Sequence, residues 1–255
     1  MKALPVLAAL AALAPISATA QEPGEEEITY AIAPIEVDDS NSALGGAEYT
    51  IGAGYASSYN YRGVDYGQHA GEAEGAMKAP VGDVGVFTLG GRYIGTGESF
   101  NEGQAFSEFQ IPLGPAAAFL GYRYFTNDGQ DELAMDTDNR HEIGAMLRSR
   151  FFSVDFSFGY FYDTGHEGHY TELSGAKAWA LAPLVHIRAS AKASYGFDYQ
   201  FEGSGFNHFQ TSLELPIDLS ESVELSPFVT AVVPGSDLST QDDAVVGGMN
   251  LKVSF

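Results

Sequence analysis

The amino-acid sequence predicts an all-β protein, a transmembrane antiparallel up-and-down β-barrel of 12 strands. Three observations predict this fold. Apolar residues alternate with polar or small residues over unusually long runs, these runs recur along the chain with turn residues between them, and the last run ends on the aromatic residue Phe255. A strand of a soluble protein usually spans about 5 or 6 residues, whereas a tilted strand that crosses a bilayer needs about 9 to 11.

The amino terminus predicts export. Met1 and Lys2 form a short positive region, residues 3–16 are apolar, and small residues at 18–20 form a cleavage site, so residues 1–20 are expected to be a signal peptide. The apolar run is too short for a membrane-spanning helix and contains two prolines. Residues 21–46 are acidic and are expected to be a flexible periplasmic leader. The alternative is a plug whose acids meet inward-facing arginines of the barrel, which spans residues 47–255.

The strands follow from alternation with a period of two. The clearest runs extend from Phe152 to Tyr162, from Val185 to Tyr199, from Tyr49 to Tyr61 and from Val245 to Phe255. The full set of expected strands is 47–62, 70–79, 84–95, 103–113, 116–126, 139–149, 152–163, 169–181, 185–199, 205–216, 223–233 and 244–255. Segments 70–79 and 223–233 alternate most weakly, which leaves 10 or 14 strands open.

The connections between these strands alternate in length. Short joints are expected at 80–83, 114–115, 150–151, 182–184 and 218–222, and longer polar loops at 63–69, 96–102, 127–138, 164–168, 200–204 and 234–243. Short periplasmic turns and longer outer loops are typical of outer-membrane barrels. A soluble β-sandwich also produces alternation. It does not explain long two-faced strands whose apolar side ends in tyrosines, and a closed barrel leaves no sheet edge in lipid.

Two segments carry a family resemblance. The C-terminal Phe255, preceded by alternating apolar residues, resembles the assembly signal of Gram-negative outer-membrane β-barrels, so residues 47–255 are similar to that class. The stretch from Ala56 to Val64, with the sequence ASSYNYRGV, resembles the opening of the TorF-like porin family. The resemblance implies an outer-membrane channel of undefined substrate, recognised by the barrel assembly machinery, and it supplies no catalytic residues.

Composition excludes several classes of function. The formal charge of −22 excludes a nucleic-acid binder, which needs a basic surface. The absence of cysteine excludes disulfides, thiolate metal sites and cysteine nucleophiles. With 45% hydrophobic residues the chain is too apolar to be a disordered acidic polymer.

Strand phase separates the charges. Many acids fall in the expected outer loops, whereas most of the basic residues fall on inward phases together with a matching set of acids, so the interior is close to balanced. The predicted pore-lining residues are Arg62, Arg92, Arg123, Arg148, Arg188, Lys192, Lys252, Glu108, Glu142, Asp155, Glu172, Asp198 and Glu214. Outward tyrosines and phenylalanines, with Trp179 near the periplasmic side, are expected to anchor the barrel at the membrane interfaces.

No catalytic, cofactor or metal site is predicted, and we do not expect an enzyme. Residues 136–139 begin like a calcium loop, but Arg140 and His141 stand at its next ligand and glycine positions. The loop from Asp163 to His169 contains two histidines and two acids that can bind a metal, although their spacing is not that of zinc proteases. His186 and His208 are expected to form hydrogen bonds in the lumen, and no nucleophile-and-base constellation appears.

Together these features predict an outer-membrane porin-like channel for passive diffusion of small hydrophilic solutes. Its expected partners are outer-membrane lipid, the assembly machinery through Phe255, and the solutes themselves, with no nucleic acid. Two alternatives stay open. The mixed charges can form a salt-bridged filling, with Arg148 and Asp155 pairing across one hairpin. The barrel can also be non-conducting and serve as a structural, surface-binding or anchoring protein through its loops.

Overall fold

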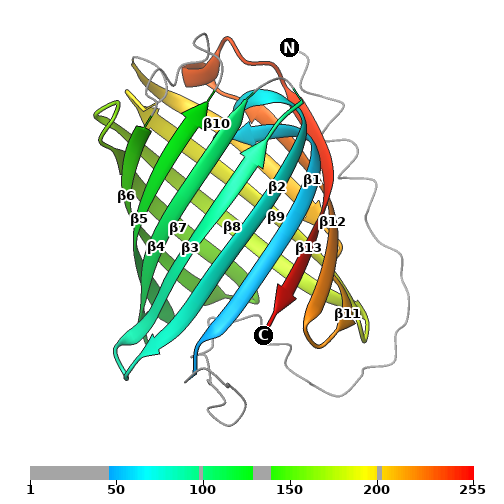
Figure 1. Cartoon of the computed structure of the whole chain (residues 1–255). Coiled ribbons are helices and arrows are strands. Elements are labelled where there is room, and N and C mark those ends of the chain that lie inside the picture. Colours follow the sequence, from blue (N-terminus) through cyan, green and yellow to red (C-terminus); the bar gives the residue numbers. More distant parts are fainter. Residues whose placement is uncertain (1–45, 98–99, 129–138, 200–202) are drawn as a thin grey trace. The chain divides into compact units, whose positions relative to one another are not determined.

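The computed structural model describes residues 46–97, 100–128, 139–199 and 203–255, which form one closed antiparallel β-barrel (Figure 1). The predicted signal peptide, residues 1–20, and the predicted leader lie outside the described residues, except for Gly46. No helix within the described ranges is long and apolar enough to cross a membrane.

The barrel wall follows the alternation of the sequence. Its strands are β1 (Glu48–Tyr61), β2 (Val64–Val81), β3 (Gly85–Gly95), β4 (Asn101–Leu113), β5 (Ala116–Asp128), β6 (Asn139–Phe151), β7 (Val154–Asp163), β8 (Gly168–Ala182), β9 (Val185–Phe197), β10 (Ser204–Glu214), β11 (Ile217–Ser220), β12 (Val223–Pro234) and β13 (Ala244–Ser254). A short 3₁₀ helix, η1 (Ser236–Leu238), lies between β12 and β13.

The segments β10 and β11 form one interrupted strand. Both pair with β9 on one side and with β12 on the other. Pro216 lies between them, and because proline has no backbone N–H it interrupts the ladder. The described residues therefore make a 12-stranded barrel, which confirms the predicted fold and strand number.

The barrel closes where β1 pairs with β13. At this seam the backbone of Tyr49 both donates to and accepts from Phe255, with N···O distances of 2.8 and 3.0 Å. The two rings stack with centroids 6.5 Å apart. The C-terminal residue therefore helps to seal the sheet, and closure removes the free edge that an open sheet would expose to lipid.

The two faces of the wall differ in polarity. Large apolar side chains are exposed on the outer face, for example Leu120, Phe158, Leu173 and Val245, each more than half exposed. This outer surface fits the lipid-facing band of a transmembrane barrel. We call the end with the tight connections, such as 81–85 and 113–116, the turn end, and the opposite end, which carries η1, the loop end. Trp179 is exposed on β8 near the turn end, beside Lys177.

The first outer connection differs from the prediction. Residues 63–69 were expected to be a loop, yet β2 begins at Val64, directly after a tight turn in which Arg62 and Gly63 have φ of 51° and 87°. We call residues 59–66 the hairpin tip. It curves over the barrel near its upper end (Figure 1). The register of β1 shifts between Ser58 and Asn60, and such a bulge bends a strand.

The hairpin tip is buried instead of exposed to lipid. Tyr59 is only 7% exposed, and it packs with Val64, Tyr66 and Phe100 in an apolar cluster that Leu238 of η1 completes. The expectation that Tyr59 anchors the membrane surface is therefore wrong. Aromatic side chains on both faces of this hairpin allow both faces to be buried once the strand bends inward.

Candidate functional site

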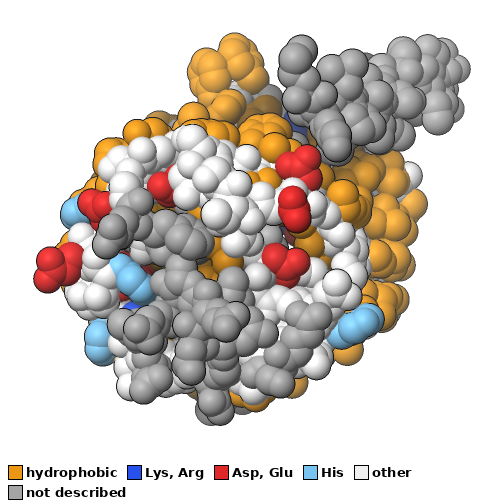
Figure 2. All heavy atoms as spheres, turned by 90° about the horizontal axis from the view of Figure 1, so that it is seen from above, with side chains coloured by type: hydrophobic (Ala, Val, Ile, Leu, Met, Phe, Trp, Pro, Cys, Tyr) orange, Lys and Arg blue, Asp and Glu red, His pale blue; other side chains and the backbone are white. Residues whose placement is uncertain are grey.

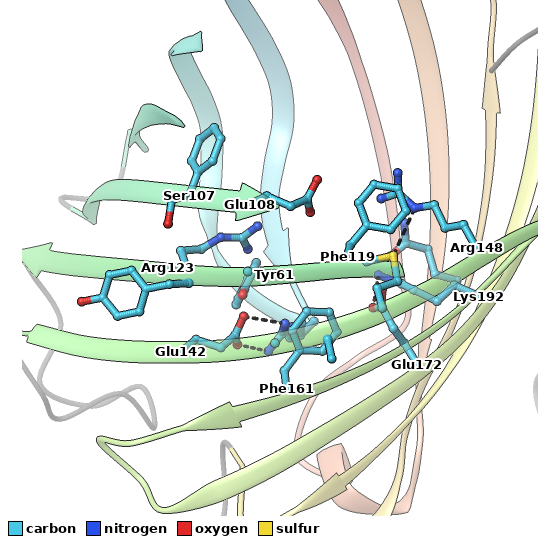
Figure 3. Close-up of a pocket in the computed structure, with 18 of the residues that line it drawn as sticks. Tyr61, Ser107, Glu108, Phe119, Arg123, Glu142, Arg148, Phe161, Glu172 and Lys192 are labelled. Atoms are coloured by element: carbon cyan, nitrogen blue, oxygen red, sulfur yellow. Dashed lines mark hydrogen bonds and ion pairs between the residues drawn. The ribbon is translucent and has the colours of Figure 1, made fainter. Parts of the chain in front are cut away.

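The lumen of the barrel contains cavities lined by charged and small residues. Three of them have volumes of about 360, 210 and 170 Å³. The largest of these three is lined mainly by β4 to β9, together with residues 60–62 and Gln210 of β10. Figure 3 shows Glu108, Arg123 and Arg148 projecting toward it from separate strands. The volume of this cavity falls at the lower end of the range of small-molecule sites.

Most of the predicted pore-lining residues lie on this inner surface. The largest cavity is lined by Arg62, Glu108, Arg123, Glu142, Arg148, Glu172 and Lys192, the second by Arg92, and the third by Glu214 and Lys252. Arg188 pairs with Glu214 across adjacent strands. Asp198 departs from the prediction, because it follows the end of β9, is exposed, and accepts a hydrogen bond from the N–H of Gly203 at 2.7 Å.

Several inward charges are paired along the wall. Lys192 lies 3.7 Å from Glu172, Arg188 lies 3.7 Å from Glu214, and Arg92 pairs with Glu72. In each case the partners come from adjacent strands. These pairs line the wall and do not cross the lumen.

The expected pair between Arg148 and Asp155 is wrong. Phe152 and Ser153 form the turn with positive φ of 50° and 58°, so the register places Arg150, not Arg148, opposite Asp155. Arg150 donates to both carboxylate oxygens of Asp155, at 2.7 and 3.0 Å. Arg148 instead lies over the ring of Phe119, 4.2 Å from its centroid, and faces the largest cavity.

A buried ionic cluster holds the hairpin tip. The guanidinium of Arg62 donates to both carboxylate oxygens of Glu142 and to the hydroxyl of Tyr199. It also lies over the rings of Phe161 and Tyr170, at 4.5 and 4.1 Å from their centroids. We call Glu142, Phe161, Tyr170 and Tyr199 the Arg62 cage.

A second buried pair adjoins the cage. Arg140 donates to Asp163 at 3.0 Å, and both side chains are fully buried. Arg140 also lies over the ring of Phe125, 3.9 Å from its centroid. The hydroxyl of Tyr199 donates to Glu142 at 2.7 Å, and burial raises the pKa of this phenol well above its usual value. The phenol therefore stays a neutral donor within the cluster.

The Arg62 cage connects opposite sides of the barrel. Arg62 lies in the turn directly after β1, whereas Glu142, Phe161 and Tyr170 belong to β6, β7 and β8. Three strands separate β2 from β6 in the sheet, so the ion pair between Arg62 and Glu142 spans the lumen. The hairpin tip therefore narrows the lumen toward the loop end.

Arg150, Asp163 and Tyr199 are not among the predicted pore-lining residues, although they take part in these contacts. Arg150 and Asp163 share the inward phase of neighbours that were recognised, so extending the alternation by one step would have found them. Tyr199 was expected on the outward face, but it is fully buried. No sequence pattern indicates that Tyr199 turns inward. Asp198 has a positive φ of 49°, and this backbone turn ends the alternation of inward and outward side chains before Tyr199.

The loop from Asp163 to His169 does not gather its metal-binding groups. Asp163 pairs with Arg140 and lies 3.5 Å from Nδ1 of His166, whereas Nδ1 of His169 faces the hydroxyl of Tyr160 at 2.6 Å on an exposed surface. Within the described ranges no group of three or more His, Asp or Glu side chains is placed to hold a metal ion. Residues 136–138 of the calcium-like stretch lie outside the described residues.

The inward histidines form hydrogen bonds and ion pairs. Nε2 of His186 lies 3.3 Å from Asp218. Nδ1 of His208 is 2.9 Å from Oγ of Ser194 and 2.7 Å from Oδ1 of Asn207. Both contacts of His208 fall on one ring nitrogen and the ring is fully buried, so the geometry is not that of a base that activates an accessible nucleophile.

Comparison with solved structures identifies the fold. No protein-family model and no curated protein sequence matches the chain. The chain is similar to the KdgM porin (8% identity, TM-score 0.52, 81% of this chain and 99% of the other). It is also similar to the NanC porin (12% identity, TM-score 0.51, 81% of this chain and 98% of the other). A third similar structure is the COG4313 outer membrane channel from Pseudomonas putida F1 (6% identity, TM-score 0.52, 82% of this chain and 95% of the other). At such low identities the likeness shows the fold alone, which is that of outer-membrane β-barrels.

Proposed function

We propose that this protein is an outer-membrane porin-like channel for passive diffusion of small hydrophilic solutes. One observation carries the proposal: the barrel encloses cavities whose walls combine charged side chains with small residues, the largest cavity having about 360 Å³. Charged groups on the wall of a pore bias which solutes pass. The exposed apolar outer face supports a position in the membrane.

The finer parts of the proposal rest on the sequence. The stretch from Ala56 to Val64 supports membership of the TorF-like porin family. The expected signal peptide supports export to the outer membrane. Phe255 is 66% exposed beside the closing seam, which supports its proposed recognition by the assembly machinery.

The arrangement of the ion pairs argues against a completely filled barrel. Pairs such as Arg150 with Asp155 and Lys192 with Glu172 connect neighbouring strands and leave the lumen between the walls. The pair of Arg62 with Glu142 crosses the lumen, and it does so near the loop end. We therefore propose a channel that the hairpin tip narrows and does not fill over its whole length.

Planar-bilayer recording tests the channel. The purified, folded full-length protein should give discrete conductance steps, and the same preparation unfolded by heat should give none. The variant Arg62→Ala belongs in the same experiment, because it removes the contact that crosses the lumen. Silence of both folded proteins would overturn the channel and would favour a non-conducting, anchoring barrel.

A further inference from the structure

A repeated set of pairs, each of a tyrosine with a histidine or an asparagine, lies near the loop end on the outer face of β1 to β8. Three tyrosine hydroxyls lie at 2.8, 2.6 and 2.6 Å from the Nδ1 atoms of histidines, and two others donate to asparagine Oδ1 atoms at 2.9 and 2.6 Å. The pairs are Tyr55–His69, Tyr122–His141, Tyr160–His169, Tyr93–Asn101 and Tyr124–Asn139. We call these ten residues the tyrosine arc. Figure 2 shows histidine side chains at separate places around the outer edge of this end.

All pairs of the arc share one geometry. The tyrosine lies on an odd-numbered strand, and its partner lies on the next strand, two residues nearer the loop end than the residue directly opposite the tyrosine. Tyr55, for example, is opposite Gly71 and pairs with His69, two residues away. Such diagonal neighbours are within reach of long side chains. The same arrangement recurs on all four hairpins from β1 to β8, which makes it a repeated feature of the surface and not a single contact.

The tyrosines fix the orientation of the imidazoles. His141 lies between Tyr122 and Tyr124, with ring centroids 5.9 and 5.0 Å away, and His169 lies similarly between two tyrosines. When a tyrosine donates to Nδ1, the neutral ring carries its proton on Nε2. Each of the three histidines then offers an N–H donor on the outer face of the barrel.

This arrangement differs from an ordinary aromatic belt, in which the phenol of a tyrosine meets the lipid headgroups directly. Where the phenol donates to the imidazole, the imidazole N–H takes the place of the phenol proton at the surface. The residue opposite Tyr55 is Gly71, and nothing lies within 4 Å of its Cβ position, which leaves room beside His69.

We propose that the tyrosine arc binds the phosphate groups of phosphorylated lipids in the outer leaflet. This inference rests on the proposed outer-membrane position, in which the loop end faces outward, and it does not require that the barrel conducts. A phosphate oxygen accepts hydrogen bonds strongly, and an outward imidazole N–H is a matching donor. Because the chain has a net charge of −22, long-range attraction of anions is unfavourable, so binding depends on these local donors.

The chain itself supplies a matched control for the test. Asn101 and Asn139 occupy the partner position on two hairpins, and asparagine combines an acceptor for the tyrosine with an N–H donor. The triple variant His69→Asn, His141→Asn and His169→Asn should therefore keep both the acceptor for each tyrosine and an N–H donor at the surface. The triple variant with phenylalanine at the same positions keeps an aromatic belt but removes every imidazole donor.

Native mass spectrometry of the full-length protein, extracted from nanodiscs that contain lipid A, measures retention of this bisphosphorylated glycolipid. Wild type and the asparagine triple variant should retain it in preference to its dephosphorylated form. The phenylalanine triple variant should lose about tenfold in retention or more, the effect expected from one hydrogen bond to a charged group. The three single phenylalanine variants serve if the triple variant does not fold, and each should retain less than wild type.

Two results would overturn the proposal. Equal retention by wild type and the phenylalanine variants would mean that the arc only anchors the barrel at the interface. Full displacement of lipid A by inorganic phosphate would mean that the site recognises free phosphate and not a lipid. A barrel that binds lipid A but never conducts would contradict the proposed channel and leave the lipid surface standing.

Discussion

At the scale of single residues, Arg62 concentrates the interactions that hold the hairpin tip. Its guanidinium is 6% exposed, and it faces a carboxylate, a phenol and several aromatic rings. A planar fork of donors suits a bidentate carboxylate and also stacks on rings, which an ammonium group cannot do as well. Removing one partner of such a buried pair leaves an uncompensated charge, and that loss is larger than the gain from the pair itself.

We expect Arg62→Ala to lower the free energy of unfolding by about 3–5 kcal/mol, because Glu142 is left buried without its partner. The matched control is Arg188→Ala, since Arg188 and Glu214 lie 3.7 Å apart with side chains 55% and 37% exposed. An exposed pair of this kind contributes at most about 1 kcal/mol. Urea unfolding in detergent micelles, followed by circular dichroism, measures both. Equal losses in the two variants would contradict the proposed importance of the Arg62 cage.

The sequence predicts whether a strand residue faces the lumen or the lipid, but it does not predict which residue on the neighbouring strand it pairs with. Alternation places Arg148 and Asp155 on the inner face, and both lie there. Their expected pairing is wrong because the turn at Phe152 and Ser153 shifts the register by two residues. Such a turn depends on positive φ at two residues other than glycine, and composition does not reveal that choice.

At the scale of elements, the β1–β2 hairpin differs most from the other strands. It combines a bulge after Ser58 with a two-residue turn, and its tip packs against Leu238 of η1. The strands themselves were largely predictable, because inside-outside alternation is required wherever one face meets lipid and the other lines a lumen. The inward bend was not predictable, because the alternating tyrosines of β1 read equally well as a lipid-facing row.

The packing of the hairpin tip predicts the effect of a methyl group at Gly63. Gly63 has φ of +87°, and a Cβ there would come 2.4 Å from Cδ1 of the buried Leu238. Gly82 at the turn end has φ of +53° with nothing within 4 Å of its Cβ position, so Gly82→Ala measures backbone strain alone. We expect Gly63→Ala to lose about 1–3 kcal/mol more stability than Gly82→Ala, through overpacking. Chemical unfolding of both variants decides, and indistinguishable midpoints would mean that the tip tolerates the added volume.

The position of the hairpin tip also predicts conductance. If the tip narrows the lumen, releasing it through Arg62→Ala should raise the single-channel conductance above that of wild type. Arg188→Ala should leave the conductance close to wild type, because its ion pair connects neighbouring strands and does not cross the lumen. Planar-bilayer recordings under identical salt conditions compare the three proteins. A conductance of Arg62→Ala equal to wild type would show that solutes do not pass the tip.

At the scale of the whole molecule, net charge and lumen charge differ. The chain carries −22, yet the inner wall pairs several of its acids with arginine or lysine, as in the pairs of Lys192 with Glu172 and Arg92 with Glu72. Arg123 and Arg148 face the largest cavity and have no carboxylate within 4.0 Å among the described side chains; both lie over phenylalanine rings. Strand phase predicted the near balance of the interior, whereas only the folded structure distinguishes paired from unpaired arginines, because the partners lie far apart in the sequence.

This distribution predicts the ion preference of the channel. We expect chloride to pass despite the acidic chain. Arg123 and Arg148 outnumber Glu108, the one carboxylate without an ion pair among the described lining residues, and so leave net positive charge on the wall of the largest cavity. Replacing both by glutamine should move the reversal potential in a potassium chloride gradient toward the cation-selective limit, about 59 mV for a tenfold gradient. Lys177→Gln removes a charge beside Trp179 on the lipid-facing surface and should leave the potential unchanged. If the double variant conducts with the reversal potential of wild type, Arg123 and Arg148 do not lie on the path of the ions, and the selectivity must arise at the acidic rim.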